Sequence, residues 1–129
     1  MNLLQVLYVD DEPDIREIAA LALSLDPDVR VRLADGGEQA LAAIDAGWRP
    51  DVILLDVMMP VMDGPTVLAA LRERPASAAI PIVFITARTQ SQDRHRLLQL
   101  GAVGVISKPF DPMTLARELR AVLAAVAVA

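Results

Sequence analysis

The chain has 129 residues, of which 54% are hydrophobic, and this length supports one domain with a well-buried core. Its net charge of −5 argues against a nucleic-acid surface, because binding to phosphates requires clustered lysine and arginine side chains. The sequence has no cysteine, which excludes disulfides, a thiolate nucleophile and cysteine-ligated metals. No signal-peptide pattern opens it, and no apolar stretch approaches the roughly 20 residues of a membrane span. We therefore expect a soluble, cytoplasmic protein without a membrane partner.

Strand and helix patterns alternate from the start of the chain. A short apolar run ends in the acids Asp10 and Asp11, and Pro13 then suits the first turn of a helix, because its missing N–H is not needed there. A Val-Arg-Val-Arg-Leu alternation follows and predicts a strand with one polar face. Asp35, with Glu38 three residues later, is typical of a capping box that opens a second helix.

The centre of the sequence is the stretch from Asp51 to Gly64. Its apolar run, residues 52–55, leads directly into Asp56. A run of this kind, bounded by turn signals, predicts a strand buried on both faces. An unpaired ionised carboxylate is strongly disfavoured in an apolar interior, so we expect Asp56 at the carboxyl end of the strand. Open α/β sheets place their ligand crevice at that edge.

The alternation continues through the second half of the chain. The predicted strands are residues 5–9, 29–33, 52–56, 81–86 and 103–107. The predicted helices open at Pro13, Asp35, Gly64, Ser91 and Asp111. Five strands that alternate with five helices indicate an α/β fold whose parallel sheet is covered on both faces. No linker or repeat interrupts the pattern, so we expect one domain over residues 1–129 with no effector domain.

Polar side chains gather at the ends of four predicted strands. Asp10 and Asp11 follow the first strand, Asp56 ends the third, Thr86 ends the fourth and Lys108 follows the fifth. The carboxyl ends of parallel strands share one edge of a sheet, so these residues should converge. Each carboxylate pair about 4 Å apart costs roughly 4 kcal/mol at an effective dielectric near 20, so the cluster needs a proton or a cation. Hard oxygen ligands supplemented by water suit Mg²⁺.

The chain resembles the receiver domain of two-component response regulators. Four pieces match in the family's order and spacing: Val-Asp-Asp-Glu (9–12), Leu-Asp-Val-Met-Met-Pro-Val-Met-Asp-Gly (55–64), Ile-Thr-Ala-Arg (85–88) and Lys-Pro-Phe (108–110). The similarity covers essentially the whole chain. It implies a doubly wound, flavodoxin-like sheet of five parallel strands in the order 2-1-3-4-5, with five helices.

The resemblance also implies a role for each strand-end residue. Asp56 is the expected phosphoacceptor, attacking a phosphohistidine on a sensor histidine kinase or a histidine phosphotransfer protein. Lys108 and Thr86 are expected to contact phosphoryl oxygens. The bond that precedes Pro109 is expected to be cis and to aim the lysine into the site. Such a protein is not an enzyme in the usual sense, because it catalyses only its own phosphorylation and dephosphorylation.

Magnesium is the cofactor that the resemblance implies. Asp11, Asp56 and the backbone carbonyl of Met58 are the expected direct ligands, and Asp10 is expected to bind through water. The metal would neutralise charge on the phosphoryl group during transfer.

The sequence departs from the family at two places that concern output. The family often has an aromatic residue three positions before the lysine, and here Val105 stands there. The segment 102–105 also lacks the acids and tyrosine that accompany pairing through the last two helices. We therefore expect a monomer or weak dimer that signals to an unknown downstream protein through small shifts near residues 91–108.

Two other functions remain open at this point. A degenerate receiver could act as a metal-independent interaction module, although the intact set of acids argues against it. An aspartyl-phosphate hydrolase would need a second aspartate two positions after the nucleophile, where this chain has Met58. His95 is expected on the surface and Trp48 as a packing anchor, both outside the site.

Overall fold

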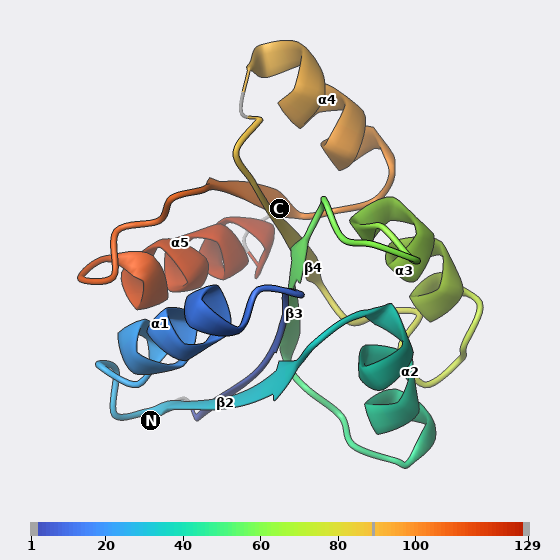
Figure 1. Cartoon of the computed structure of the whole chain (residues 1–129), viewed down its shortest axis with the longest axis horizontal. Helices are drawn as coiled ribbons and strands as arrows, with labels where there is room; N and C mark the ends of the chain where they lie inside the picture. The colour runs from blue at the N-terminus through green and yellow to red at the C-terminus, as the bar shows by residue number, and fades with distance from the viewer. Residues whose placement is uncertain (1–2, 89, 128–129) are drawn as a thin grey trace.

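A computed structural model describes residues 3–88 and 90–127, with five parallel strands in the order β2-β1-β3-β4-β5 (Figure 1). The strands are β1 (Leu4–Val9), β2 (Val29–Ala34), β3 (Val52–Asp56), β4 (Ile82–Thr86) and β5 (Gly104–Ser107). The helices are α1 (Pro13–Leu23), α2 (Gly37–Asp45), α3 (Gly64–Arg72), α4 (Ser91–Gln99) and α5 (Leu115–Ala127). This is the doubly wound, flavodoxin-like fold that the sequence predicts.

The sheet separates two hydrophobic layers, which explains the continuous apolar runs of its central strands. Successive side chains of a strand point to opposite faces, so Leu7 and Val9 pack toward α2 and α3 while Val6 and Tyr8 pack toward α1 and α5. Every residue of β3 and β4 is buried. Each fully buried aliphatic side chain contributes about 1.5–3 kcal/mol, so these layers hold the strand ends in place.

The register of the sheet brings the carboxyl ends of the strands to one level. Val9 of β1 pairs with Leu55 of β3, so Asp10 and Asp56 occupy neighbouring positions just beyond that pair. Thr86 at the end of β4 pairs with Ser107, the residue before Lys108. The topology therefore gathers at one edge the side chains that the sequence places far apart.

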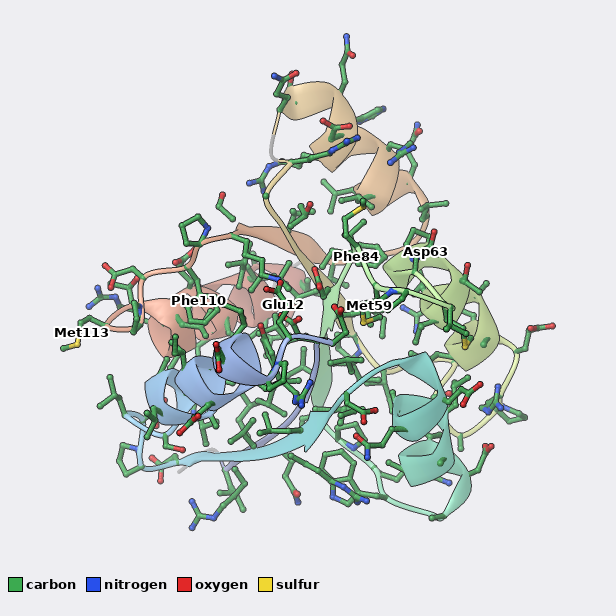
Figure 2. All side chains as sticks on the ribbon, viewed as in Figure 1. Glu12, Met59, Asp63, Phe84, Phe110 and Met113 are labelled. Atoms are coloured by element: carbon green, nitrogen blue, oxygen red, sulfur yellow. The ribbon has the colours of Figure 1, made fainter. Side chains whose placement is uncertain are left out.

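A glycine lets α3 begin close to the end of β3. A Cβ atom on Gly64 would lie 2.7 Å from the backbone oxygen of Asp56 and 2.9 Å from the ring of Phe84, which is too close for any side chain. Asp63 caps the helix, and its carboxylate accepts a 2.9 Å hydrogen bond from the backbone N–H of Thr66. Figure 2 labels Phe84 and Asp63, which lie near the start of α3. Gly64 and the Asp63 cap therefore fix the point at which the loop after Asp56 ends and α3 begins.

Two predicted helix starts are wrong in detail. The N-cap of α2 is Gly36 rather than Asp35, and no side chain caps it. The backbone N–H of Asp35 donates instead to the side-chain oxygen of Gln39 at 2.7 Å, so Glu38 does not close a capping box. The last helix begins four residues after Asp111, because the Asp111 carboxylate accepts the N–H of Met113 and stabilises a turn first.

The two residues expected to lie outside the site do so. His95 is exposed on α4. Trp48 is partly buried against the layer under α2 and α3, and the Arg32 guanidinium lies 5.1 Å from the centre of its ring. Within the described part of the chain, no helix is both long and apolar enough to cross a membrane.

Candidate functional site

Three carboxylates meet at the carboxyl edge of the sheet. Asp10 follows β1 and is fully buried, Asp56 ends β3 and is 3% exposed, and Asp11 is partly exposed beside them. One carboxylate oxygen of each lies within 4.8 Å of the others. This set of hard oxygen donors, with one open side at Asp11, fits a small divalent cation that keeps some of its water. The structure therefore brings together all three predicted acidic ligands.

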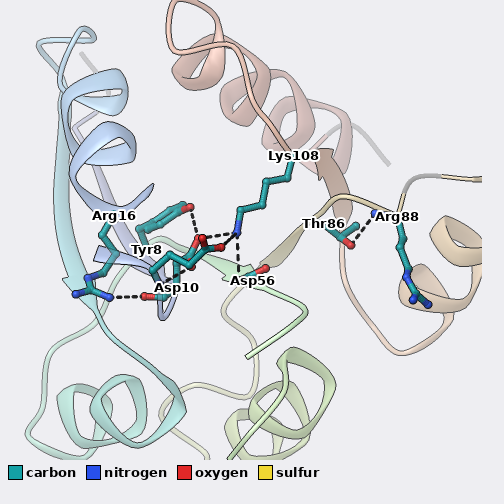
Figure 3. Close-up of polar contacts among 8 residues, drawn as sticks. Tyr8, Asp10, Arg16, Asp56, Thr86, Arg88 and Lys108 are labelled. Carbon is teal, nitrogen blue, oxygen red and sulfur yellow. Dashed lines mark hydrogen bonds and ion pairs between the residues drawn. The ribbon is translucent and has the colours of Figure 1, made fainter. Parts of the chain in front are cut away.

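Lys108 reaches into this cluster from the end of β5. Its ammonium lies 3.0 Å from Asp10 Oδ2, 3.2 Å from Glu12 Oε1 and 3.4 Å from Asp56 Oδ2 (Figure 3). The peptide bond between Lys108 and Pro109 is cis, as the resemblance implies. Lys108 is the only lysine in the sequence. Its ammonium pairs with the carboxylates of Asp10, Glu12 and Asp56, and the carboxylate of Asp11 belongs to the same cluster.

The charges of the cluster shift the acidity of its members. Burial, with the negative charge of Asp10, raises the pKa of Asp56 to about 6, although Lys108 and the backbone N–H of Met58 oppose this change. Burial alone would lower the pKa of Lys108, but its hydrogen bond to Asp10 and the charge of Asp56 outweigh that effect and raise the pKa. The site therefore has an excess of negative charge that a bound cation would offset.

Asp10 is held by hydrogen bonds on both oxygens. Its Oδ1 accepts from the backbone N–H of Glu12 at 3.0 Å, and its Oδ2 accepts from the Tyr8 hydroxyl at 2.9 Å as well as from Lys108. The Arg16 guanidinium donates to the backbone oxygen of Asp10 at 2.8 Å. Burial and the charge of Asp10 raise the pKa of Tyr8, so its phenol stays neutral and acts as the donor.

Tyr8 and Glu12 also belong to the site, although the sequence pattern did not predict this. A signal for Tyr8 was present, because a residue two positions before Asp10 points to the same face of an extended strand. Glu12 is the N-cap of α1, where acids are ordinary, so its ion pair with Lys108 depends on a contact that only the fold reveals.

Thr86 and Met58 complete the predicted set. Thr86 is 2% exposed at the end of β4, and its Oγ1 accepts a 3.0 Å hydrogen bond from the backbone N–H of Arg88. The hydroxyl uses its oxygen in that bond, so its hydrogen can still be donated. The side chain of Met58 is 64% exposed beside Asp56, and the role of its backbone carbonyl as a ligand remains a prediction.

Known proteins with similar sequences match this chain over the length of a receiver domain, although the whole proteins differ in kind. A family model described as the response regulator receiver domain matches residues 6–120. The response regulator Rre1 of Synechocystis is 37% identical over 121 residues, which are 94% of this chain and 52% of that protein. A protein-glutamate methylesterase/protein-glutamine glutaminase of Cereibacter sphaeroides is 42% identical over 107 residues, which are 81% of this chain and 28% of that protein.

A solved structure supports the same assignment. The chemotaxis response regulator CheY4 of Vibrio cholerae superposes with a TM-score of 0.83 at 36% identity, covering 94% of this chain and 99% of that chain. By contrast, the chain spans only about a quarter to a half of the length of the curated relatives named above. The match over residues 6–120, the shared fold and the gathered acids lead to one conclusion: the chain belongs to the family of response regulator receiver domains.

Proposed function

We propose that this chain accepts a phosphoryl group on Asp56, in a Mg²⁺-dependent reaction, from a phosphohistidine of a sensor histidine kinase or a histidine phosphotransfer protein. The observation that carries the proposal is the contact of Lys108 with Asp10 and Asp56 inside the cluster of acids at the strand ends. A carboxylate nucleophile beside an ammonium and a cation-binding group is the arrangement that transfer of a phosphoryl group requires.

In the proposed transfer, a carboxylate oxygen of Asp56 forms the new bond to phosphorus. The P–N bond to the donor imidazole breaks, and its electron pair remains on the imidazole nitrogen. Asp56 must be ionised to attack, and its pKa of about 6 in the cation-free protein leaves part of the population protonated near neutral pH. When bound, Mg²⁺ supplies positive charge that favours the ionised carboxylate and offsets the charge of the phosphoryl oxygens.

The other residues of the site have separate roles in this proposal. Asp10, Asp11 and Asp56 supply the oxygens that hold the cation, with the carbonyl of Met58 as a further ligand. Lys108 exchanges a carboxylate partner for a phosphoryl oxygen once Asp56 is phosphorylated, since its ammonium is already 3.4 Å from that carboxylate. The hydroxyl of Thr86 donates to a second phosphoryl oxygen.

The phosphorylated state would act on a partner through the surface formed by residues 91–108. Val105 is buried there, and its backbone oxygen accepts a 3.1 Å hydrogen bond from Arg94 of α4, which links that helix to β5. We propose a cytoplasmic monomer or weak dimer that signals to a downstream protein. The intact cluster of acids supports this function over an unmodified interaction module, and Met58 lies where a hydrolase would need its acid.

The direct test is chemical phosphorylation. With phosphoramidate and Mg²⁺, the mass of the intact protein should increase by one phosphoryl group, and Asp56→Asn should prevent the increase. Asp51→Asn is the matched control, because this exposed carboxylate lies just before the opposite end of β3, where it accepts the N–H of Gln5. Removal of Mg²⁺ with a chelator should stop the reaction of the wild type. Labelling of Asp56→Asn at the wild-type rate would contradict the proposal.

A further inference from the structure

Tyr8 connects the hydrophobic core to the acidic site. It is fully buried on β1, in the layer beneath α1 and α5, and its ring is among the largest buried side chains of the described chain. Its hydroxyl leaves this apolar layer and donates to Asp10 Oδ2 at 2.9 Å (Figure 3). A buried hydroxyl needs a partner, and here that partner is a member of the proposed cation site.

The oxygen that Tyr8 contacts is also the oxygen that receives the ammonium of Lys108 at 3.0 Å. The second oxygen of Asp10 accepts the backbone N–H of Glu12 at 3.0 Å. Three donors from β1, β5 and the start of α1 therefore surround one carboxylate. Rotation of its plane would break at least one of these hydrogen bonds, so the orientation of Asp10 is determined from the core side as well as from the site.

We propose that Tyr8 is a positioning residue of the phosphorylation site, whose hydroxyl holds the Asp10 carboxylate in the orientation that serves both Lys108 and the divalent cation. This inference rests on the proposed function. The hydroxyl of Tyr8 donates to Asp10 rather than to the reacting carboxylate of Asp56, so Tyr8 acts through Asp10. Partners of this kind, which orient a group at a metal site, typically change metal affinity or activity by about 10- to 100-fold when they are removed.

The first experiment removes only the hydroxyl. Tyr8→Phe keeps the ring, and with it the packing of the layer, but deletes the donor to Asp10. Isothermal titration with Mg²⁺ should show an affinity about tenfold lower than that of the wild type. Phosphorylation by phosphoramidate, measured at Mg²⁺ concentrations that saturate each protein, should also be slower. A wild-type Mg²⁺ affinity in Tyr8→Phe would mean that the tyrosine is only a core residue, and would overturn the inference.

The second experiment needs neither metal nor phosphate. Tyr8 and Lys108 are the only tyrosine and the only lysine of the chain, so isotope labelling of these two residue types gives one phenol signal and one ammonium signal. In Mg²⁺-free protein, Tyr8→Phe should shift the ¹⁵N signal of the Lys108 ammonium, and Asp10→Asn should shift the ¹³Cζ signal of Tyr8. An unchanged lysine signal in Tyr8→Phe would contradict the inference.

The matched control is Val6→Ala, two residues earlier on the same face of β1 and also fully buried. It should lower the melting temperature but leave the Mg²⁺ affinity and the lysine signal unchanged. Equal effects from Val6→Ala and Tyr8→Phe would show general loosening of the core and overturn the inference. Failure of the wild type to accept phosphate would reject the proposed function, whereas the lysine signal would still decide whether Tyr8 positions Asp10.

Discussion

The two sides of the acidic site at the carboxyl edge of the sheet differ in how firmly the fold holds them. On the β1 side, Asp10 is fully buried and accepts hydrogen bonds from three groups on different elements. On the β4 side, Leu97 is the one buried residue of α4 within residues 91–99. A hydrogen bond from Arg94 links this helix to β5. Asp10 is therefore held firmly in one orientation, whereas α4, which forms part of the proposed output surface, has few buried contacts and can move at low cost.

The largest effect should come from removing the ammonium of Lys108, which reaches from the end of β5 to the buried Asp10 on the firm side. Lys108→Met leaves Asp10 and Asp56 buried without their cationic partner, and breaking a buried ion pair in this way costs about 3–5 kcal/mol. Urea unfolding at neutral pH without Mg²⁺ should show the loss, and added Mg²⁺ should recover part of it. The exposed pair of Arg74 with Asp45 is the control, and Arg74→Met should change stability much less. Equal losses would remove the distinction between buried and exposed pairs.

The pH dependence of stability gives a second test of the firm side. In the folded, Mg²⁺-free protein the pKa of Asp56 is about 6, against an ordinary value of 3.8. Between these values the folded state binds more protons than the unfolded state, so the contribution of Asp56 to stability falls as pH rises from about 4 to about 6. The wild type should therefore lose stability relative to Asp56→Asn over this range, as measured by urea unfolding. A constant difference between the two proteins would contradict the prediction.

Some features of the fold and the site could be predicted from the sequence, and others could not. The strand ends, the three acids and Lys108 were predictable because buried parallel strands have long apolar runs and their carboxyl ends must share an edge. The contact of Tyr8 with Asp10 was not, because a tyrosine in a buried strand is a common core residue and its hydroxyl can find several partners. The start of α2 was misassigned because Gln39 can reach the N–H of Asp35 as well as Glu38 can, and local sequence does not decide between them.

A smaller effect is expected from loosening the β4 side. Arg94→Ala removes the 3.1 Å hydrogen bond to the backbone oxygen of Val105, which should lower global stability by about 1 kcal/mol. Amide hydrogen exchange should become faster in α4 but not around Asp10, and phosphorylation of Asp56 should stay near the wild-type rate. Arg96→Ala, at an exposed position of the same helix, is the control and should leave exchange unchanged. Faster exchange around Asp10 in Arg94→Ala would show that the two sides are not independent.

The smallest effect concerns the loop between the two sides, where Val61 has a positive φ of 69° and is 93% exposed. A β-branched residue in this conformation is strained by about 1 kcal/mol or more, and its side chain gains little from packing. Val61→Gly should therefore stabilise the protein slightly, by less than about 1 kcal/mol, because the greater freedom of glycine in the unfolded chain offsets part of the relief. Thermal unfolding would measure the change. A lower melting temperature would mean that the valine makes a compensating contribution, and the strain at this loop would then be smaller than its backbone angle indicates.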